Sequence, residues 1–429
     1  MTRTLTIGLS LSPTWLSGNG WRRADSGVQD LFTPAAAIEI ARQAEAAHLD
    51  FVFRADSLHL DPAAVATGPG FAALDPTLMM TAVAGATSRI GLVTTASALF
   101  YPAYILARQV ASLHWISDGR AGWNLVTALD GARNFGQADL PPPDARYAQA
   151  EVVLAQVRRL WDSFPQAAMI LDRAAGRFAD PAQLVLASGD PVEGPLTLPA
   201  HPSGPPPIFQ AGASAAGRDF AARQADAIFA ATPDRDAAVS LRADLRDRSR
   251  RAGRDPDAVR VLPGLSLYLG ATRDAAESLY HDTHAGADRR RRLAMVRAQI
   301  GLDLTDLPGD QPVTPDMLPQ PPAHPRSRTH AALLARMIAR DRPTVDDLLA
   351  RPEVAASGHW QVIGTPDDAV ARIADWQAAG AIDGFVALPG GSRDCLSLLL
   401  TQVVPRLAEA GLFRRAYAGR TLRDHLGLA

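Results

Sequence analysis

The stretch that decides the fold is Gly119-Arg120-Ala121-Gly122-Trp123-Asn124-Leu125-Val126-Thr127. Its mostly apolar run, 121–127, is typical of a buried strand, and the polar residues Asn124 and Thr127 lie toward the strand's end. Other segments along the chain have a similar character, and most are separated from the next by helix-like sequence. The predicted strands are 5–9, 50–56, 90–96, 121–127, 208–212, 227–230, 259–269 and 383–388.

Strands that alternate with helices predict a parallel sheet, and eight strands are the number that closes a (β/α)8 TIM barrel. An open doubly wound sheet is the alternative. We expect one α/β domain, 1–429, with insertions, the largest of which lies between the seventh and eighth strands. This insertion, 270–360, is predicted to be a helical or lid segment with one weak helix pair. Thr33 is predicted to cap the first helix.

The composition indicates a soluble globular protein. The 429 residues are 47% hydrophobic and 21% charged, with a formal net charge of -2. This balance argues against electrostatic binding to nucleic acid or to acidic membranes. No apolar run approaches the roughly 18 residues of a membrane helix, and no secretory signal precedes the first strand, so a cytoplasmic location is expected.

Two scarce residue types exclude several chemistries. The only cysteine, Cys395, cannot form an intramolecular disulfide, a cysteine zinc site or an iron–sulfur cluster, and its apolar surroundings predict a buried side chain. The chain contains no lysine, which excludes Schiff-base enzymes and the P-loop. His281 and His284 have a spacing that could chelate, but they lack a further ligand, so no metal site is predicted.

Polar residues gather at the carboxyl ends of successive predicted strands, where barrel enzymes carry their functional groups. Asp56 ends the second strand, Thr95 lies near the end of the third, and Asn124 and Thr127 lie toward the end of the fourth. Each residue alone could be an N-cap, a turn former or a core hydroxyl. Their occurrence together predicts a binding site.

A phosphate site is predicted after the fifth strand. The segment Gly212-Ala213-Ser214-Ala215-Ala216-Gly217 joins this strand to a helix through small residues. Free N–H groups at the start of the helix, together with Ser214 Oγ, form an anion site. An ordinary tight turn between strand and helix is the alternative.

Several segments resemble one family of proteins. The stretch 117–127, followed by Ala132-Arg133-Asn134-Phe135-Gly136, resembles a signature of one branch of the bacterial-luciferase-like flavin enzymes. That branch contains nitrilotriacetate monooxygenase, pristinamycin synthase and dibenzothiophene sulfone monooxygenase. Further matches follow the family's order along nearly the whole chain, at 53–58, 160–163, 176–181, 194–196, 210–217, 364–366, 411–414, 421–423 and 426–428.

The resemblance implies a two-component, flavin-dependent monooxygenase. Reduced FMN would be the cosubstrate, delivered by a separate NAD(P)H:flavin reductase. It would react with O2 to a flavin hydroperoxide, and one oxygen atom would enter a small organic substrate. A homodimer or homotetramer is implied as well.

The resemblance also implies roles for individual residues around the flavin ring. Asp56, Thr95 and Asn124 are expected to lie against the isoalloxazine or its edge, with Thr127 nearby. No acid or base follows from the match. His59, on the loop after the second strand, is a candidate for the substrate pocket, and a solvent-facing loop histidine is the alternative.

At the other end of the cofactor, the phosphate is expected to be held by Tyr147, by Ser214 and by the amides of Gly212 and Ala213. The family commonly has a histidine four residues before this tyrosine, and here Pro143 takes that position. Two alternatives stay open. One is an FMN- or deazaflavin-dependent dehydrogenase or reductase on the same barrel, and the other is a flavin-binding protein without catalysis.

Overall fold

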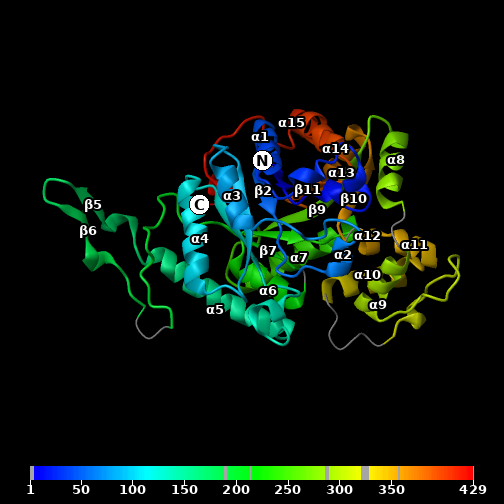
Figure 1. Ribbon diagram of the computed structural model, residues 1–429, viewed down its shortest axis with the longest axis horizontal. Coiled ribbons are helices and arrows are strands. Elements are labelled where there is room, and N and C mark those ends of the chain that lie inside the picture. The colour runs from blue at the N-terminus through cyan, green and yellow to red at the C-terminus, as the bar shows by residue number, and fades with distance from the viewer. Residues whose placement is uncertain are drawn as a thin grey trace.

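Eight parallel strands form a closed barrel in the computed structural model, which describes residues 4–187, 191–212, 214–285, 289–319, 328–355 and 358–428. Helices surround the barrel (Figure 1). In order around it, the strands are β1 (Thr6–Ser10), β2 (Phe51–Arg54), β3 (Gly91–Ser97), β4 (Ala121–Val126), β7 (Ile208–Ala211), β8 (Ala227–Ala230), β9 (Arg260–Leu269) and β11 (Gly384–Pro389). The TIM barrel is confirmed, and each predicted strand lies at its predicted place.

Alternation along each strand decides which side chains enter the barrel. In β4, Trp123 and Leu125 belong to the hydrophobic cluster that packs under the helices, so Asn124 between them is directed inward. In β3, Val93 belongs to the cluster inside the barrel, and Thr95 two residues later faces the same way. The strand pattern therefore places the polar side chains of β3 and β4 in the barrel interior.

The helices that follow the strands cover the outside of the barrel. They are α1 (Ala35–Ala46), α3 (Pro76–Ala84), α4 (Ala103–Ile116), α5 (Pro143–Asp162), α6 (Ala215–Gln224), α7 (Arg235–Arg251), α13 (Pro366–Ala378), α14 (Arg393–Leu398) and α15 (Val404–Glu409). The predicted cap at Thr33 is wrong. Pro34 is the N-cap of α1, and the Thr33 hydroxyl donates to the carbonyl oxygen of Asp30. Within the described ranges, no helix combines the length and the apolarity that crossing a bilayer requires.

The insertion between β9 and β11 contains more helix than the single weak pair predicted from the sequence. It holds α8 (Arg273–His284), α9 (Arg289–Ile300), α10 (Arg328–Asp341), α11 (Val345–Ala350) and α12 (Pro352–Ala355). These helices from α9 onward share a hydrophobic cluster, in which Val296, Leu334 and Leu348 are fully buried. Because several short helices complete this core together, none of them alone shows a strong periodic pattern. A lid role for 270–360 stays a prediction.

A ninth strand, β10 (Trp360–Gly364), was not predicted. It pairs with β9 over residues 265–269, on the same edge of β9 that pairs with β8 over residues 260–263. Trp360 stacks on Trp376 of α13, with ring centroids 3.9 Å apart. The predicted pattern of eight alternating strands and helices has no position for an additional edge strand, so it does not predict this one.

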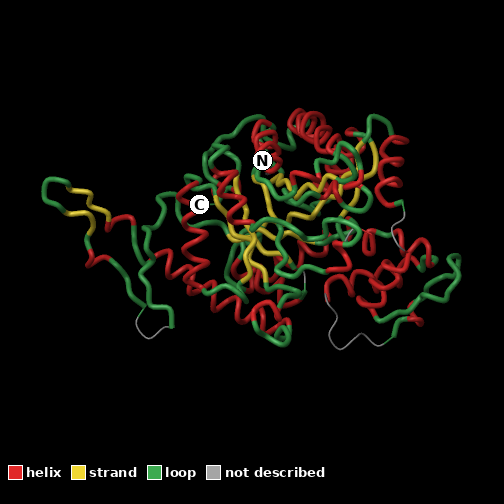
Figure 2. Tube along the Cα trace, viewed as in Figure 1, coloured by secondary structure: helices red, strands yellow, loops and turns green. Residues whose placement is uncertain are grey.

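A β-hairpin, also not predicted, stands off the body of the molecule (Figures 1 and 2). It consists of β5 (Met169–Asp172) and β6 (Arg177–Ala179), which pair only with each other in a sheet of two antiparallel strands. The hairpin follows α5 along the chain. We call residues 165–184 the arm.

The last helix, α16 (Leu422–Leu426), plugs the amino-terminal end of the barrel. Leu422 and Leu426 are fully buried and belong to the cluster inside the barrel. Two strand glycines make room for this plug. A Cβ atom at Gly91 would lie 2.6 Å from Leu422 Cδ1, and one at Gly122 would lie 2.7 Å from Leu422 Cδ2.

We expect Gly122→Ala to lower the free energy of unfolding by about 1–3 kcal/mol, because the new methyl group overpacks the site. Leu422→Ala should lower it by about 2–5 kcal/mol through the cavity that it leaves. In the Leu422→Ala background, Gly122→Ala should cost less than it does alone, since the closest clash is gone and only the 3.3 Å contacts with Phe209 and Val93 remain. Urea denaturation of the four proteins measures this coupling, and strictly additive losses would show that the two side chains do not compete for space.

Candidate functional site

Thr95 and Asn124 lie side by side inside the barrel, as neighbours in register on β3 and β4. Both side chains are buried. Asn124 Nδ2 donates to Thr95 Oγ1 at 2.9 Å, and Thr95 Oγ1 donates to the carbonyl oxygen of Arg54 at 2.6 Å. This relay crosses three adjacent strands and fixes the plane of the Asn124 amide.

The relay leaves one acceptor unused. Asn124 Oδ1 is buried and has no hydrogen-bond partner within the described protein. A buried polar atom in this condition costs about 1–3 kcal/mol, so a ligand that donates a hydrogen bond here would be favoured. The flavin ring carries an N–H in its pyrimidine part, and the site fits such a group.

Asp56 follows β2 and is partly buried. Burial raises the pKa of its carboxyl above the usual value, and the negative charge of Asp75 raises it further, while Arg54 acts in the opposite direction. Asp56 and Asp75 also raise the pKa of Tyr101, after burial, so the three side chains share one region at the end of β2 and β3. Asp56 lies two residues after Arg54, whose carbonyl oxygen accepts the hydrogen bond from Thr95 Oγ1, so it follows directly on the relay.

A second group of polar side chains surrounds the phenol of Tyr147 on α5. Gln210 Nε2 donates to Tyr147 Oη at 3.0 Å, and the side chains of Thr127 and Ser214 also hydrogen-bond with this phenol. Burial raises the pKa of Tyr147, and these hydrogen bonds partly offset the effect. The phenol is thus protonated at neutral pH. Thr127 therefore lies with the residues that are predicted to hold the phosphate.

Ser214 is the N-cap of α6, and its Oγ accepts a hydrogen bond from Gly217 N at 3.2 Å. Gly212 has φ +142°, and a Cβ atom there or at Gly217 would lie 2.7 Å from the Tyr147 oxygen. Only glycine leaves this space open beside a helix N-terminus, which fits a phosphate. Ala213 lies outside the described residues.

His59 stands apart from both groups. Its side chain is exposed, and Ser57 Oγ donates to the His59 carbonyl oxygen at 2.9 Å, which fixes the backbone of this loop. Of the pair His281 and His284, His284 also makes a contact outside both groups, because its Nε2 hydrogen-bonds with Tyr268 Oη at 3.0 Å. In the ranges that the structure describes, no three His, Cys, Asp or Glu side chains are grouped to hold a metal ion.

Two residues beside the Tyr147 phenol, Gln210 and Gly217, were not predicted as site residues from the sequence. Gln210 lies in a strand that reads as apolar, and its Oε1 is buried without a partner among the described atoms. The sequence feature that could have indicated Gln210 is an amide side chain within a buried apolar run, as for Asn124. Gly217 carries no signal by itself, because its importance comes from the approach of Tyr147 across the fold.

A cavity of about 850 Å³ lies elsewhere, on the outside of the barrel between α1 and the helices α14 and α15. Its lining includes Gln43, Asp394 and Arg415 but none of the predicted site residues. The predicted site residues lie instead at the carboxyl ends of the strands, where Asn124 Oδ1 and Gln210 Oε1 have no hydrogen-bond partner within the described protein.

Comparisons with known proteins point to one family. Residues 14–382 match the family model described as luciferase-like monooxygenase. Nitrilotriacetate monooxygenase component A of Aminobacter aminovorans is 33% identical, with 100% of this chain and 97% of that protein covered. The dibenzothiophene-sulfone monooxygenase of Rhodococcus erythropolis is 32% identical, with 95% and 92% covered. The solved structure of a riboflavin lyase with modified FMN and riboflavin has a TM-score of 0.85 and 27% identity, with 99% and 96% covered.

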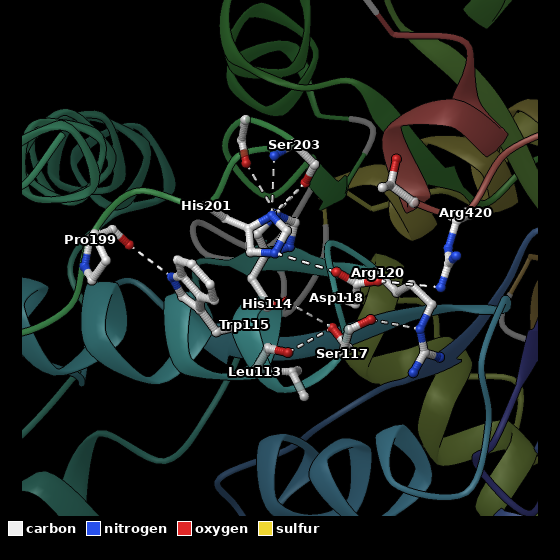
Figure 3. A network of polar contacts seen from close by, with 12 residues as sticks. Leu113, His114, Trp115, Ser117, Asp118, Arg120, Pro199, His201, Ser203 and Arg420 are labelled. Atoms are coloured by element: carbon white, nitrogen blue, oxygen red, sulfur yellow. Dashed lines mark hydrogen bonds and ion pairs between the residues drawn. The ribbon is translucent and has the colours of Figure 1, made fainter. Parts of the chain in front are cut away.

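A separate polar network lies at the opposite, amino-terminal end of β4 (Figure 3). Arg120 is buried, and its guanidinium donates five hydrogen bonds, four to backbone carbonyl oxygens and one to Thr87 Oγ1. His114 Nε2 hydrogen-bonds with the carbonyl oxygen of Gly204 at 3.1 Å, and Ser203 Oγ bridges toward His201 at 2.8 Å. The network holds the loop before β7 to the turn before β4.

This network should make stability depend on pH. Burial, then the nearby His201, lowers the pKa of His114 to about 4, whereas the unfolded chain takes up this proton near pH 6.5. The contribution of neutral His114 to the free energy of unfolding is fully present above pH 6.5. It falls by about 3 kcal/mol as the pH decreases toward 4. His114→Gln should flatten the fall in the free energy of unfolding over this window by that amount. The exposed His281→Gln is the control, and equal slopes in both variants would contradict the assignment.

Proposed function

Because the chain belongs to the luciferase-like monooxygenase family, it is a flavin-dependent monooxygenase, and we propose that its flavin is reduced FMN supplied by a separate NAD(P)H:flavin reductase. The observation that carries the flavin site is the buried Asn124 Oδ1, which has no partner among the described residues and lies at the same end of the barrel, the mouth formed by the carboxyl ends of the strands, as the anion site at Ser214. The printed name "component A" of the nitrilotriacetate enzyme supports a partner component, and the modified FMN in the riboflavin lyase supports FMN.

The barrel interior holds the ring in this proposal. Asn124 accepts a hydrogen bond from the ring and is itself oriented by Thr95, which is anchored on the backbone of β2. Asp56 lies at the edge of the ring. When bound, the flavin supplies the chemistry that activates oxygen, and the protein orients it and keeps water away.

The Tyr147 group holds the phosphate. The Tyr147 phenol stays protonated and can donate, Ser214 Oγ lies at the start of α6, and Gly212 leaves room for close approach. Gln210 positions the phenol through its amide. With the Tyr147 phenol and the Ser214 hydroxyl already at this place, the anion is bound without the histidine that the family commonly has at the position of Pro143.

The loops at the mouth favour an apolar, uncharged substrate. Leu60, Phe71 and Leu129, on the loops that follow β2 and β4, are exposed apolar side chains. Asp61 and Asp75 on the first of these loops would repel a polycarboxylate. Among the compounds named for its relatives, the sulfone therefore fits this mouth better than nitrilotriacetate does.

A dehydrogenase or reductase on the same barrel is not favoured, because the family model and the similar proteins reported above that share at least 30% identity are monooxygenases. The flavin-binding protein without catalysis is not favoured on the same ground.

The function is tested with the protein, a flavin reductase, FMN and NADH under ¹⁸O₂. We expect one labelled oxygen atom in the product and faster conversion of dibenzothiophene sulfone than of nitrilotriacetate, measured by mass spectrometry. Heat-denatured protein with the same reductase is the control. Failure to bind reduced FMN anaerobically, or equal turnover without O2, would contradict the proposal, and a preference for nitrilotriacetate would overturn the substrate class alone.

Ser214→Ala should weaken FMN by about 10- to 100-fold, because a hydrogen bond to a charged group contributes about 1.5–3 kcal/mol. Riboflavin has no phosphate, so its affinity should change little. Titration of flavin fluorescence measures both dissociation constants. Thr365→Ala is the control, since it likewise removes an N-cap, that of α13, at a residue outside the predicted phosphate group. Equal weakening of both flavins by Ser214→Ala would place the phosphate elsewhere.

A further inference from the structure

His359 is a histidine at the mouth of the barrel that the flavin site described above does not use. It directly precedes β10, and its ring lies beside the ring of Phe229 in β8, with ring centroids 5.1 Å apart. Phe229 in turn packs on the hydrophobic cluster inside the barrel. A Cβ atom at Gly264 of β9 would lie 2.5 Å from His359 Nδ1, so the glycine at this position makes room for the imidazole.

The register of the strands shows that this imidazole lies on the inner side of the barrel. Gly264 pairs with Val386 of β11, and Val386 belongs to the cluster inside the barrel. Residues in register on neighbouring strands face the same side, so the space over Gly264 that the ring occupies is interior. In the order around the barrel, β9 is four strands from β3 in either direction. His359 therefore lies across the barrel from Thr95.

The imidazole has one nitrogen without a partner. His359 Nδ1 is buried and makes no hydrogen bond within the described protein. Burial, then the nearby His330, lowers the pKa of His359 to about 4, while a hydrogen bond with the backbone of Ala230 acts in the opposite direction. The ring is therefore neutral at pH 7, and a neutral imidazole has a single N–H. Since the carbonyl oxygen of Ala230 takes this N–H from Nε2, Nδ1 is an acceptor.

A second buried polar group without a partner lies on the loop beside His359. Thr232 follows β8 by two residues and is 2% exposed, and its Oγ1 has no hydrogen-bond partner in the ranges that the structure describes. A Cβ atom at Gly358 would lie 3.7 Å from Ala231 Cβ, so this loop runs along the segment that carries His359. Buried polar groups without partners are destabilising, and two of them in one region indicate a polar group on a ligand.

We propose that His359 Nδ1 accepts a hydrogen bond from the substrate, which therefore carries an N–H or O–H group. The inference rests on the proposed function, because it takes the substrate to meet the flavin in this mouth. An uncharged, mostly apolar compound with one such donor suits both the exposed apolar side chains of the loops and the acceptor on His359. A carboxylate has no hydrogen to donate, so its oxygens would face the lone pair of Nδ1.

The first experiment compares two small probes of nearly the same shape, indole, which carries an N–H, and benzofuran, which does not. Ligand-observed NMR measures their dissociation constants for the protein saturated with oxidised FMN. We expect indole to bind about 10-fold more tightly, because only indole can donate to Nδ1. His359→Leu should abolish this preference. His359→Asn has nearly the shape of the leucine variant but places an amide oxygen near the position of Nδ1, so it should keep most of the preference.

The second experiment separates the substrate side of the mouth from the flavin. Titration of flavin fluorescence should give dissociation constants for FMN that stay within about twofold of the wild type in both His359 variants, since distant sites act independently. His281→Leu changes an exposed histidine of α8 and is the control, which should keep both the FMN affinity and the preference for indole. Thermal unfolding shows whether each variant is folded, and the comparison of the two probes on the wild type does not depend on any variant.

Three outcomes would overturn the inference. The first is equal binding of indole and benzofuran by the wild type, including binding of neither at millimolar concentrations. The second is a preference for indole that His359→Leu leaves unchanged, which would put the acceptor elsewhere. The third is a large loss of FMN affinity in folded His359→Leu, which would make the flavin the partner of Nδ1. A wild type that binds no FMN would instead contradict the proposed function itself.

Discussion

The whole molecule depends on the pairing of β8 with β9. Residues 227–230 run in register with residues 260–263, and this ladder joins the two edges of a sheet that would otherwise stay open. Closure makes the carboxyl ends of all the strands meet at one mouth. Asp56, Asn124 and Ser214, which are far apart in the chain, lie on or directly after the strands β2, β4 and β7 in the run β2-β3-β4-β7, and closure turns this edge of the sheet into part of the mouth.

The two ends of the barrel differ in how fully their polar groups are satisfied. At the amino-terminal end, Arg120 uses all its donors within the protein, which is the condition for stable burial of a charge. At the mouth, Asn124 Oδ1 and Gln210 Oε1 are buried without partners in the described protein. The chain therefore concentrates its stability at one end and leaves binding capacity at the other.

Much of this could be predicted from the sequence, because strand alternation and capping are local. Asn124 between two apolar residues and Ser214 before a helix both carry their signal within a few positions. Gln210, Gly217 and the strand β10 could not be assigned in the same way. Their roles come from Tyr147 approaching across the fold and from an edge of β9 left free beyond β8, which only the closed barrel defines.

The plug formed by α16 has a consequence for how the protein is made. The strand glycines Gly91 and Gly122 leave a hollow into which Leu422 packs, and Leu422 follows the last barrel strand, β11, along the chain. During synthesis, the strands emerge from the ribosome long before this side chain does. The barrel therefore keeps an unfilled hollow at its amino-terminal end, exposed to chaperones and proteases, until Leu422 has left the ribosome.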